Sequence, residues 1–154
     1  MTFRGIVLVG LMGLGMLSST AAMADECAVD PATAPALRWS SRAGTAAWTQ
    51  HLLTELPRLG QDLLDARPSD MDAWCPNYSE LDCAGRVQVW AYLISAMSQF
   101  ESGHRPEVTY TEAFPDASGN NVVSRGLLQL SIESGRGYQC PLTQASDLHD
   151  PLVN

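Results

Sequence analysis

Apolar side chains recur at helical spacing between residues 44 and 63, which predicts an amphipathic helical stretch. The repeating positions are Trp48, Leu52, Leu56, Leu59 and Leu63. Pro57 lies inside this stripe. Because proline has no backbone N–H group to donate, we expect it to divide the stretch into two short helices. Residues 25–41 are predicted to form an extended lead before this unit, and residues 71–82 an irregular segment after it.

A second apolar stretch, residues 86–101, contains neither glycine nor proline and predicts a longer helix. On a helical wheel its apolar face centres on Trp90, and Glu101 falls about 20° from that centre. We therefore expect a carboxylate on a buried face close to the helix C-terminus. Burial and the helix dipole both favour the protonated acid there, which is the form a general acid requires. The alternative is a Glu101 side chain that bends to the rim or pairs with Arg105 or Arg125.

A small β-hairpin or flap is predicted after this helix. Residues 107–114 favour β-structure, residues 116–121 are dense in turn formers, and two valines follow. Residues 124–131 then lead into another helix. Gly126 indicates a close approach of the backbone to another group. Gln129 offers an amide donor and acceptor among apolar neighbours, either to a ligand or to the local backbone.

The N-terminus has the pattern of an export signal, which we assign to residues 1–24. Arg4 precedes an apolar run over residues 6–17, and small residues follow at a cleavage site. The run is shorter than the roughly 20 residues that span a bilayer, so a retained anchor is the less favoured alternative. Loss of Arg4 changes the formal charge of the chain from −8 to −9. So acidic a chain is poorly suited to bind nucleic acid or an anionic membrane.

The cysteine count agrees with export. The cysteines after the leader are Cys27, Cys75, Cys83 and Cys140. An even number in an exported chain predicts two disulfides, and the sequence leaves all three pairings open. Cys75 and Cys83 are near enough in sequence to close a short loop. A zinc site is the weaker alternative, because no close pair of cysteines is present.

Glu101 and Ser102 are followed by the Gly-Leu-Leu-Gln segment at residues 126–129, and then by Asp150, Pro151 and Asn154. Taken together, these three segments resemble the soluble lytic transglycosylases. That family has a Glu-Ser pair at a helix end, a loop and a Gly-Leu-Met-Gln segment, which Glu101 with Ser102 and residues 126–129 match. Leu128 stands at the usual methionine position. Asp150, Pro151 and Asn154 resemble a later Asp-Pro…Asn segment of the family. The resemblance covers residues 86–154 alone. Because family members continue past that asparagine, we expect the sequence to be a fragment, with residues 25–85 of unknown role.

The resemblance implies a mainly α, lysozyme-like α+β fold, in which helices carry a small β-hairpin flap. It also implies cleavage of the β-1,4 bond between N-acetylmuramic acid and N-acetylglucosamine in peptidoglycan, with formation of a 1,6-anhydro product. Glu101 would act first as acid and then as base, with substrate bound by Ser102, Ser124, Gly126 and Gln129. No metal or organic cofactor is implied. We expect a monomer in the bacterial periplasm or secreted beyond it.

Three other functions stay open. If Glu107, Glu112 or Asp116 supplies a second carboxylate opposite Glu101, the enzyme would be a hydrolysing muramidase. The chain could instead bind cell-wall glycan without cutting it. It could also be an envelope interaction protein in which Glu101 is structural.

Overall fold

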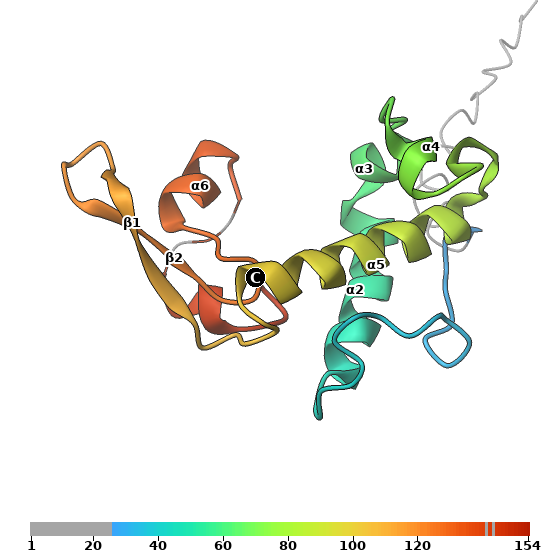
Figure 1. Ribbon diagram of the computed structural model, residues 1–154, viewed down its shortest axis with the longest axis horizontal. Helices are drawn as coiled ribbons and strands as arrows, with labels where there is room; N and C mark the ends of the chain where they lie inside the picture. Colours follow the sequence, from blue (N-terminus) through green and yellow to red (C-terminus); the bar gives the residue numbers. More distant parts are fainter. Residues whose placement is uncertain (1–25, 141, 143) are drawn as a thin grey trace, which may run out of the picture.

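The computed structural model describes residues 26–140, 142 and 144–154. The predicted export signal therefore lies outside the described residues. Figure 1 shows a helical lobe and a smaller lobe with the hairpin, joined by one long helix that runs through the middle of the molecule. Among the described residues no helix is both long and apolar enough to cross a membrane.

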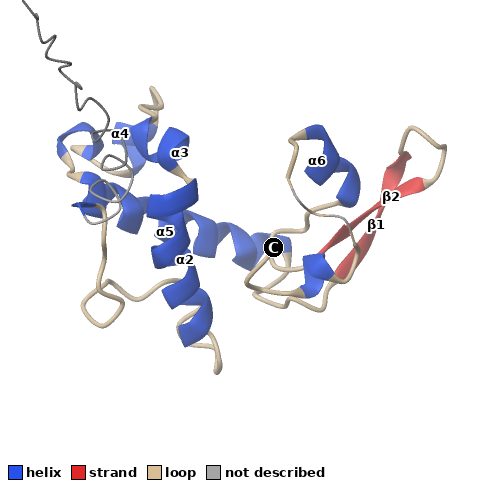
Figure 2. Ribbon diagram, turned by 180° about the vertical axis from the view of Figure 1, so that it is seen from behind, coloured by secondary structure: helices blue, strands red, loops and turns tan. Residues whose placement is uncertain are grey.

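The elements follow one another as the sequence predicts, helices first and the hairpin later. In order they are α2 (Ala46–Leu59), α3 (Gln61–Asp65), α4 (Met71–Trp74), the 3₁₀ helix η1 (Tyr78–Glu80), α5 (Cys83–Glu101), β1 (Thr109–Pro115), β2 (Asn121–Arg125), α6 (Ile132–Gly137) and the 3₁₀ helix η2 (Asp147–His149). The described chain is thus mostly helical with a two-stranded sheet (Figure 2), which confirms the predicted fold class. The segment over residues 71–82, predicted to be irregular, contains α4 and η1.

Two helices form where the first apolar stripe predicts them, but they separate at Gly60 and not at Pro57. Pro57 lies in the last turn of α2, where its missing N–H group removes one helical hydrogen bond without ending the helix. The Gly60 N–H closes the helix by donating to the Leu56 carbonyl at 2.8 Å. Leu59, which the stripe predicts to be buried, is 69% exposed.

The N-terminal segment is part of the core and not only an extended lead. The core cluster joins this segment to α2, α3 and α5, through Cys27, Leu37, Trp39, Leu53, Leu56, Leu64, Val87 and Ala91. The Trp39 ring meets Trp48 edge-on, with ring centroids 5.8 Å apart. The indole N–H of Trp39 donates to the Thr49 hydroxyl at 2.9 Å, which satisfies the polar atom of an otherwise apolar side chain.

Helix α5 begins three residues earlier than predicted and ends at Glu101 as predicted. Its Asp82 N-cap accepts a hydrogen bond from the Gly85 N–H at 2.7 Å. Its buried face is Val87, Ala91, Ser95 and Ser98. These are small or short side chains, so the N-terminal segment approaches closely enough for the Arg38 N–H to donate to Ser95 Oγ at 3.1 Å.

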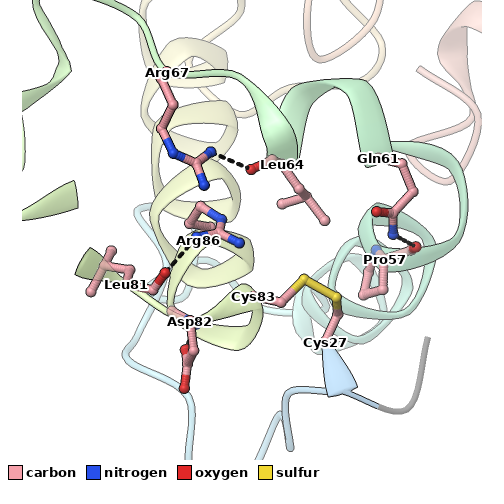
Figure 3. The surroundings of a disulfide bond; sticks show 10 residues. Cys27, Pro57, Gln61, Leu64, Arg67, Leu81, Asp82, Cys83 and Arg86 are labelled. Atoms are coloured by element: carbon pink, nitrogen blue, oxygen red, sulfur yellow. Dashed lines mark hydrogen bonds between the residues drawn. A yellow bond between two sulfur atoms is a disulfide. The ribbon is translucent and has the colours of Figure 1, made fainter. Parts of the chain in front are cut away.

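A single disulfide joins Cys27 to Cys83, which are 56 residues apart (Figure 3). It ties the N-terminal segment to the start of α5. Cys75 and Cys140 are free among the described residues, so the prediction of two disulfides is wrong. Figure 1 shows the reason, because α4 and α6, which these cysteines follow, lie in different lobes.

Strands β1 and β2 form the predicted antiparallel hairpin. Thr111 pairs with Val123 and Pro115 pairs with Asn121, so three residues of β1 stand opposite one residue of β2. This irregularity is a bulge beginning at Glu112. Beyond the hairpin, Ser131 caps α6 by accepting a hydrogen bond from the Ser134 N–H at 3.0 Å.

Candidate active site

Glu101 is the last residue of α5 and its side chain is exposed, so the prediction that it lies on the buried face is wrong. The buried face lies about 100° around the helix from Trp90, where serines and Ala91 take the places expected of large apolar residues. Hydrophobic periodicity could not find that face because half of it is polar. Glu101 is consequently exposed. Helix α5, which ends at this residue, runs from the helical lobe to the smaller lobe (Figure 1).

Neither arginine proposed as a partner of Glu101 forms an ion pair with it among the described residues. The Arg105 Nε–H donates to the Ser102 carbonyl at 3.0 Å. The Arg125 guanidinium donates to the Val123 carbonyl at 2.9 Å. The carboxylate of Glu101 is therefore left available to a ligand.

Ser102 fixes the backbone directly after Glu101. It is 4% exposed. Its hydroxyl donates to the Leu127 carbonyl at 3.0 Å and accepts from the Arg105 N–H at 3.1 Å. Ser102 was predicted to bind substrate, but its hydroxyl is engaged within the protein. It joins the helix end to the turn over residues 126–129.

That turn is built on two residues with positive φ, Gly126 at 80° and Gln129 at 50°. The Gly126 N–H donates to the Val108 carbonyl at 3.0 Å. The Gln129 side-chain amide also donates to Val108, at 3.2 Å, and to the Gly126 carbonyl at 2.9 Å. The Gln129 side-chain N–H groups thus donate to the local backbone, which is one of the two roles considered from the sequence. A part for Gln129 in binding a sugar stays a prediction.

Asn154 holds the same turn from the other side. Its side-chain oxygen accepts from the Leu128 N–H at 2.6 Å. Its side-chain nitrogen donates to the carbonyls of Arg125 at 2.7 Å and Leu148 at 2.9 Å. A Cβ atom at Gly126 would lie 1.8 Å from the Leu148 oxygen. The close approach predicted at Gly126 is therefore confirmed, and it is made to the protein's own backbone.

Glu112 is distinguished from the other flap carboxylates by its setting. It begins the bulge in β1, and its Oε1 atom accepts a hydrogen bond from the Ser124 hydroxyl across the hairpin at 2.7 Å. Ser124 is 6% exposed, so this donor is held in place by packing. Ser124 was predicted to bind substrate, and its hydroxyl orients Glu112 instead. Bulges often re-aim side chains beside active sites.

The remaining flap carboxylates have less specific surroundings. Asp116 Oδ1 accepts from the N–H groups of Ser118 at 2.8 Å and Asn120 at 2.9 Å, so this side chain stabilises the hairpin turn. Glu107 is exposed in the loop before β1. Sequence reasoning named three candidates, and the strand pairing that brings Ser124 to Glu112 is what separates them.

His104 lies three residues after Glu101, in the loop that follows α5. It is 6% exposed, its φ is 59°, and its ring packs edge-on against Trp39. Its Nδ1 atom lies 2.8 Å from Ser98 Oγ. The Ser98 hydroxyl donates to the Ser95 carbonyl at 2.9 Å, so Nδ1 must be the donor in this contact. Burial, Arg42 and Arg38 together lower the pKa of His104.

Comparisons with known proteins support the fold. No protein-family model matches the chain, and no curated protein does either. The chain is similar to the solved structure of wild-type Bd0314 DslA from Bdellovibrio, with a TM-score of 0.74 and 46% identity. The match covers 77% of this chain and 66% of DslA, slightly under two thirds of its length. Two further DslA structures, each a variant with one glutamate replaced by glutamine, match with a TM-score of 0.73 and 45% identity.

The match covers 77% of this chain, more than either lobe alone, and DslA has the lysozyme-like type of fold. A sequence identity of 46% together with a TM-score of 0.74 indicates more than a general resemblance of shape. The chain therefore has the lysozyme-like fold.

Proposed function

We propose that this chain carries the active site of a peptidoglycan-cleaving muramidase, which hydrolyses the β-1,4 bond between N-acetylmuramic acid and N-acetylglucosamine. Glu101 is the general acid and Glu112 is the second carboxylate. The observation that carries the proposal is the setting of Glu112, on a strand bulge and oriented by the buried Ser124 hydroxyl. A carboxylate held in this way has a defined direction, as a catalytic group requires.

The two carboxylates suit the two halves of glycoside hydrolysis. Glu101 would give its proton to the glycosidic oxygen as the bond from that oxygen to C1 breaks. Glu112 would take a proton from a water molecule as the water oxygen bonds to C1. The sum is addition of one water across the bond, and solvent exchange returns both carboxyl groups to their starting state. A bound glycan strand would also exclude water from the exposed Glu101, and general acids work best in such sites.

The structural neighbours add independent support. The two glutamates replaced by glutamine in the DslA variants are eleven positions apart in that chain. Glu101 and Glu112 are also eleven positions apart here. Because the spacing is the same and the chains are 45% identical, we take the two glutamates of DslA to correspond to Glu101 and Glu112.

A lytic transglycosylase is the second candidate, favoured by Glu101 with Ser102 and by the Gly-Leu-Leu-Gln turn at residues 126–129. In that reaction Glu101 would first give its proton to the glycosidic oxygen as the bond from that oxygen to C1 breaks. It would then take the proton from the C6 hydroxyl of the muramic acid as that oxygen bonds to C1. A second carboxylate has no required part in it. The orientation of Glu112 by Ser124 is therefore the feature that favours the hydrolase.

The proposal is tested by measuring cleavage of purified peptidoglycan by the full chain and three single variants. We expect Glu101→Gln and Glu112→Gln each to lower the rate by about 10²- to 10⁴-fold, the usual contribution of a positioned acid or base. Glu107→Gln is the matched control, because this exposed carboxylate lies on the same flap. Near-normal cleavage by Glu112→Gln would return the assignment to a transglycosylase. Binding without cleavage by the wild type would indicate a glycan-binding module.

A further inference from the structure

Tyr110 lies on the same face of the hairpin as Glu112. Tyr110 is paired with Ser124 in the antiparallel register. Residues directly opposite one another in such a pair project to the same face. Ser124 is also the residue whose hydroxyl reaches the Glu112 carboxylate. The side chains of Tyr110 and Glu112 are therefore both on the Ser124 side of the sheet, two positions apart along β1.

The exposure of Tyr110 contrasts with that of its strand partner. Tyr110 is 60% exposed, whereas Ser124 opposite it is 6% exposed. Val122, the next residue of β2 on the same face, is 8% exposed. The face of the hairpin is thus closed along β2 and open along β1. The Tyr110 ring stands at that open edge with no aromatic partner among the described residues.

A large exposed aromatic ring beside a catalytic carboxylate can bind a sugar by stacking. One side of a pyranose ring presents C–H groups, which pack against an aromatic face, while its hydroxyl groups remain able to form hydrogen bonds. Tyrosine provides such a face with few rotatable bonds, so little conformational entropy is lost when a sugar binds. Its hydroxyl tip stays in water.

We propose that the Tyr110 ring is a sugar-binding platform, on which one pyranose of the glycan strand stacks beside the bond that is cut. The inference rests on the proposed function, because it takes Glu112 as a catalytic group. Two positions along a strand span about 7 Å, so a sugar stacked on Tyr110 is a direct neighbour of the group at Glu112. Tyr110 therefore binds the glycan strand and sets the position of the strand relative to Glu112. It takes no part in proton transfer.

The test measures binding and cleavage separately. Binding of N-acetylglucosamine oligomers is followed by calorimetry in the Glu101→Gln background, where the ligand is not consumed. Kinetic constants on peptidoglycan are measured in the otherwise unchanged chain. Tyr110→Ala removes the ring and Tyr110→Phe restores it without the hydroxyl. Trp74→Ala is the matched control, because Trp74 is a 79% exposed aromatic at the end of α4. Helix α4 lies in the helical lobe, away from the hairpin (Figure 1).

We expect Tyr110→Ala to weaken oligomer binding about 5- to 10-fold and to raise KM more than it lowers kcat. Tyr110→Phe should restore both, and Trp74→Ala should change neither. Equal binding by Tyr110→Ala and its parent would overturn the platform, even if the chain cleaves peptidoglycan. Ring-dependent binding in a chain whose wild type does not cleave would keep the platform and reject the proposed hydrolysis.

Discussion

The hydroxyl of Ser102 donates a hydrogen bond to the carbonyl of Leu127, 3.0 Å away and 25 residues later in the chain. This contact connects the residue after Glu101 to the turn that Asn154 holds from its far side. The end of α5 and the base of the hairpin are thereby fixed to one another. Ser102 is a positioning residue in this arrangement, since its hydroxyl is buried and fully engaged.

Substitution of Ser102 by alanine is expected to loosen this junction. The Leu127 carbonyl and the Arg105 N–H would lose their partner, which costs about 1–3 kcal/mol of unfolding free energy. Because Glu101 would then be less well positioned, kcat should fall while KM changes little. Urea unfolding and steady-state kinetics measure the two effects. Ser118→Ala, on the exposed hairpin turn, is the control and should be neutral in both.

Alanine substitution at two glycines distinguishes the cost of backbone strain from the cost of a steric clash. Gly126 and Gly119 have nearly the same φ, 80° and 83°, so alanine is strained equally at both positions. At Gly119 a new Cβ would meet nothing within 4 Å, and we expect a loss of about 1–2 kcal/mol. At Gly126 it would collide with the Leu148 backbone, so Gly126→Ala should unfold the hairpin lobe or prevent folding.

Thermal unfolding of Gly126→Ala and Gly119→Ala, compared with the wild type, measures this difference. Equal melting temperatures for the two variants would mean that the turn over residues 126–129 does not pack against the C-terminal segment as described.

The local signals of the sequence predicted the order of the elements, the C-terminal end of α5 and the turn of the hairpin. Gly103 and Pro106 follow α5 closely and stop it, and the turn formers at residues 116–121 define the hairpin. These features depend on neighbouring residues alone. The position of Glu101 at a helix end followed from them, whereas the lysozyme-like fold was implied by the family resemblance.

The sequence could not predict the orientation of Glu101, or which of the three flap carboxylates is held in place, because both depend on tertiary packing. The buried face of α5 contains Ser95 and Ser98, whose polarity hid it from a search for apolar periodicity. Ser95 is buried because it receives a hydrogen bond from the Arg38 N–H, 57 residues away. The prediction of two disulfides failed for the same reason, because disulfide formation depends on which segments meet in three dimensions.

His104 makes the stability of the fold dependent on pH. Burial first, and the charges of Arg42 and Arg38 next, lower its pKa below 6.5 in the folded chain. A weaker contact with the Arg38 backbone opposes this shift in part. Its Nε2 atom has no hydrogen-bond partner among the described residues, and the Arg38 backbone offsets only part of the cost of protonating the buried ring. The neutral ring is therefore the form that the fold accommodates.

Between pH 6.5 and the lowered folded value, the unfolded chain binds a proton at His104 and the folded chain does not. Stability from this residue is thus complete above pH 6.5 and falls as the pH decreases, by at most about 1.4 kcal/mol per pH unit. Urea unfolding between pH 7.5 and 5 measures the slope. His104→Gln should flatten it, and an unchanged slope in that variant would assign the pH dependence to other groups.

The cysteine assignment predicts a definite chemical result. Under denaturing conditions without reductant, thiol titration of the full chain should find two reactive groups, Cys75 and Cys140. Replacing Cys27 and Cys83 together by serine should leave this number unchanged and lower the unfolding free energy by about 2–5 kcal/mol. An absence of free thiols in the wild type would show a second disulfide and contradict the single bridge.

The central claim is that Glu101 and Glu112 hydrolyse glycan strands, and mass analysis of the sugars released from purified peptidoglycan tests it most directly. The full chain is compared with its Glu101→Gln and Glu112→Gln variants. We expect the wild type alone to release products with a free reducing end, each one water heavier than the anhydro form. Anhydro products from the wild type and from Glu112→Gln, or no products from any chain, would contradict the two-carboxylate account.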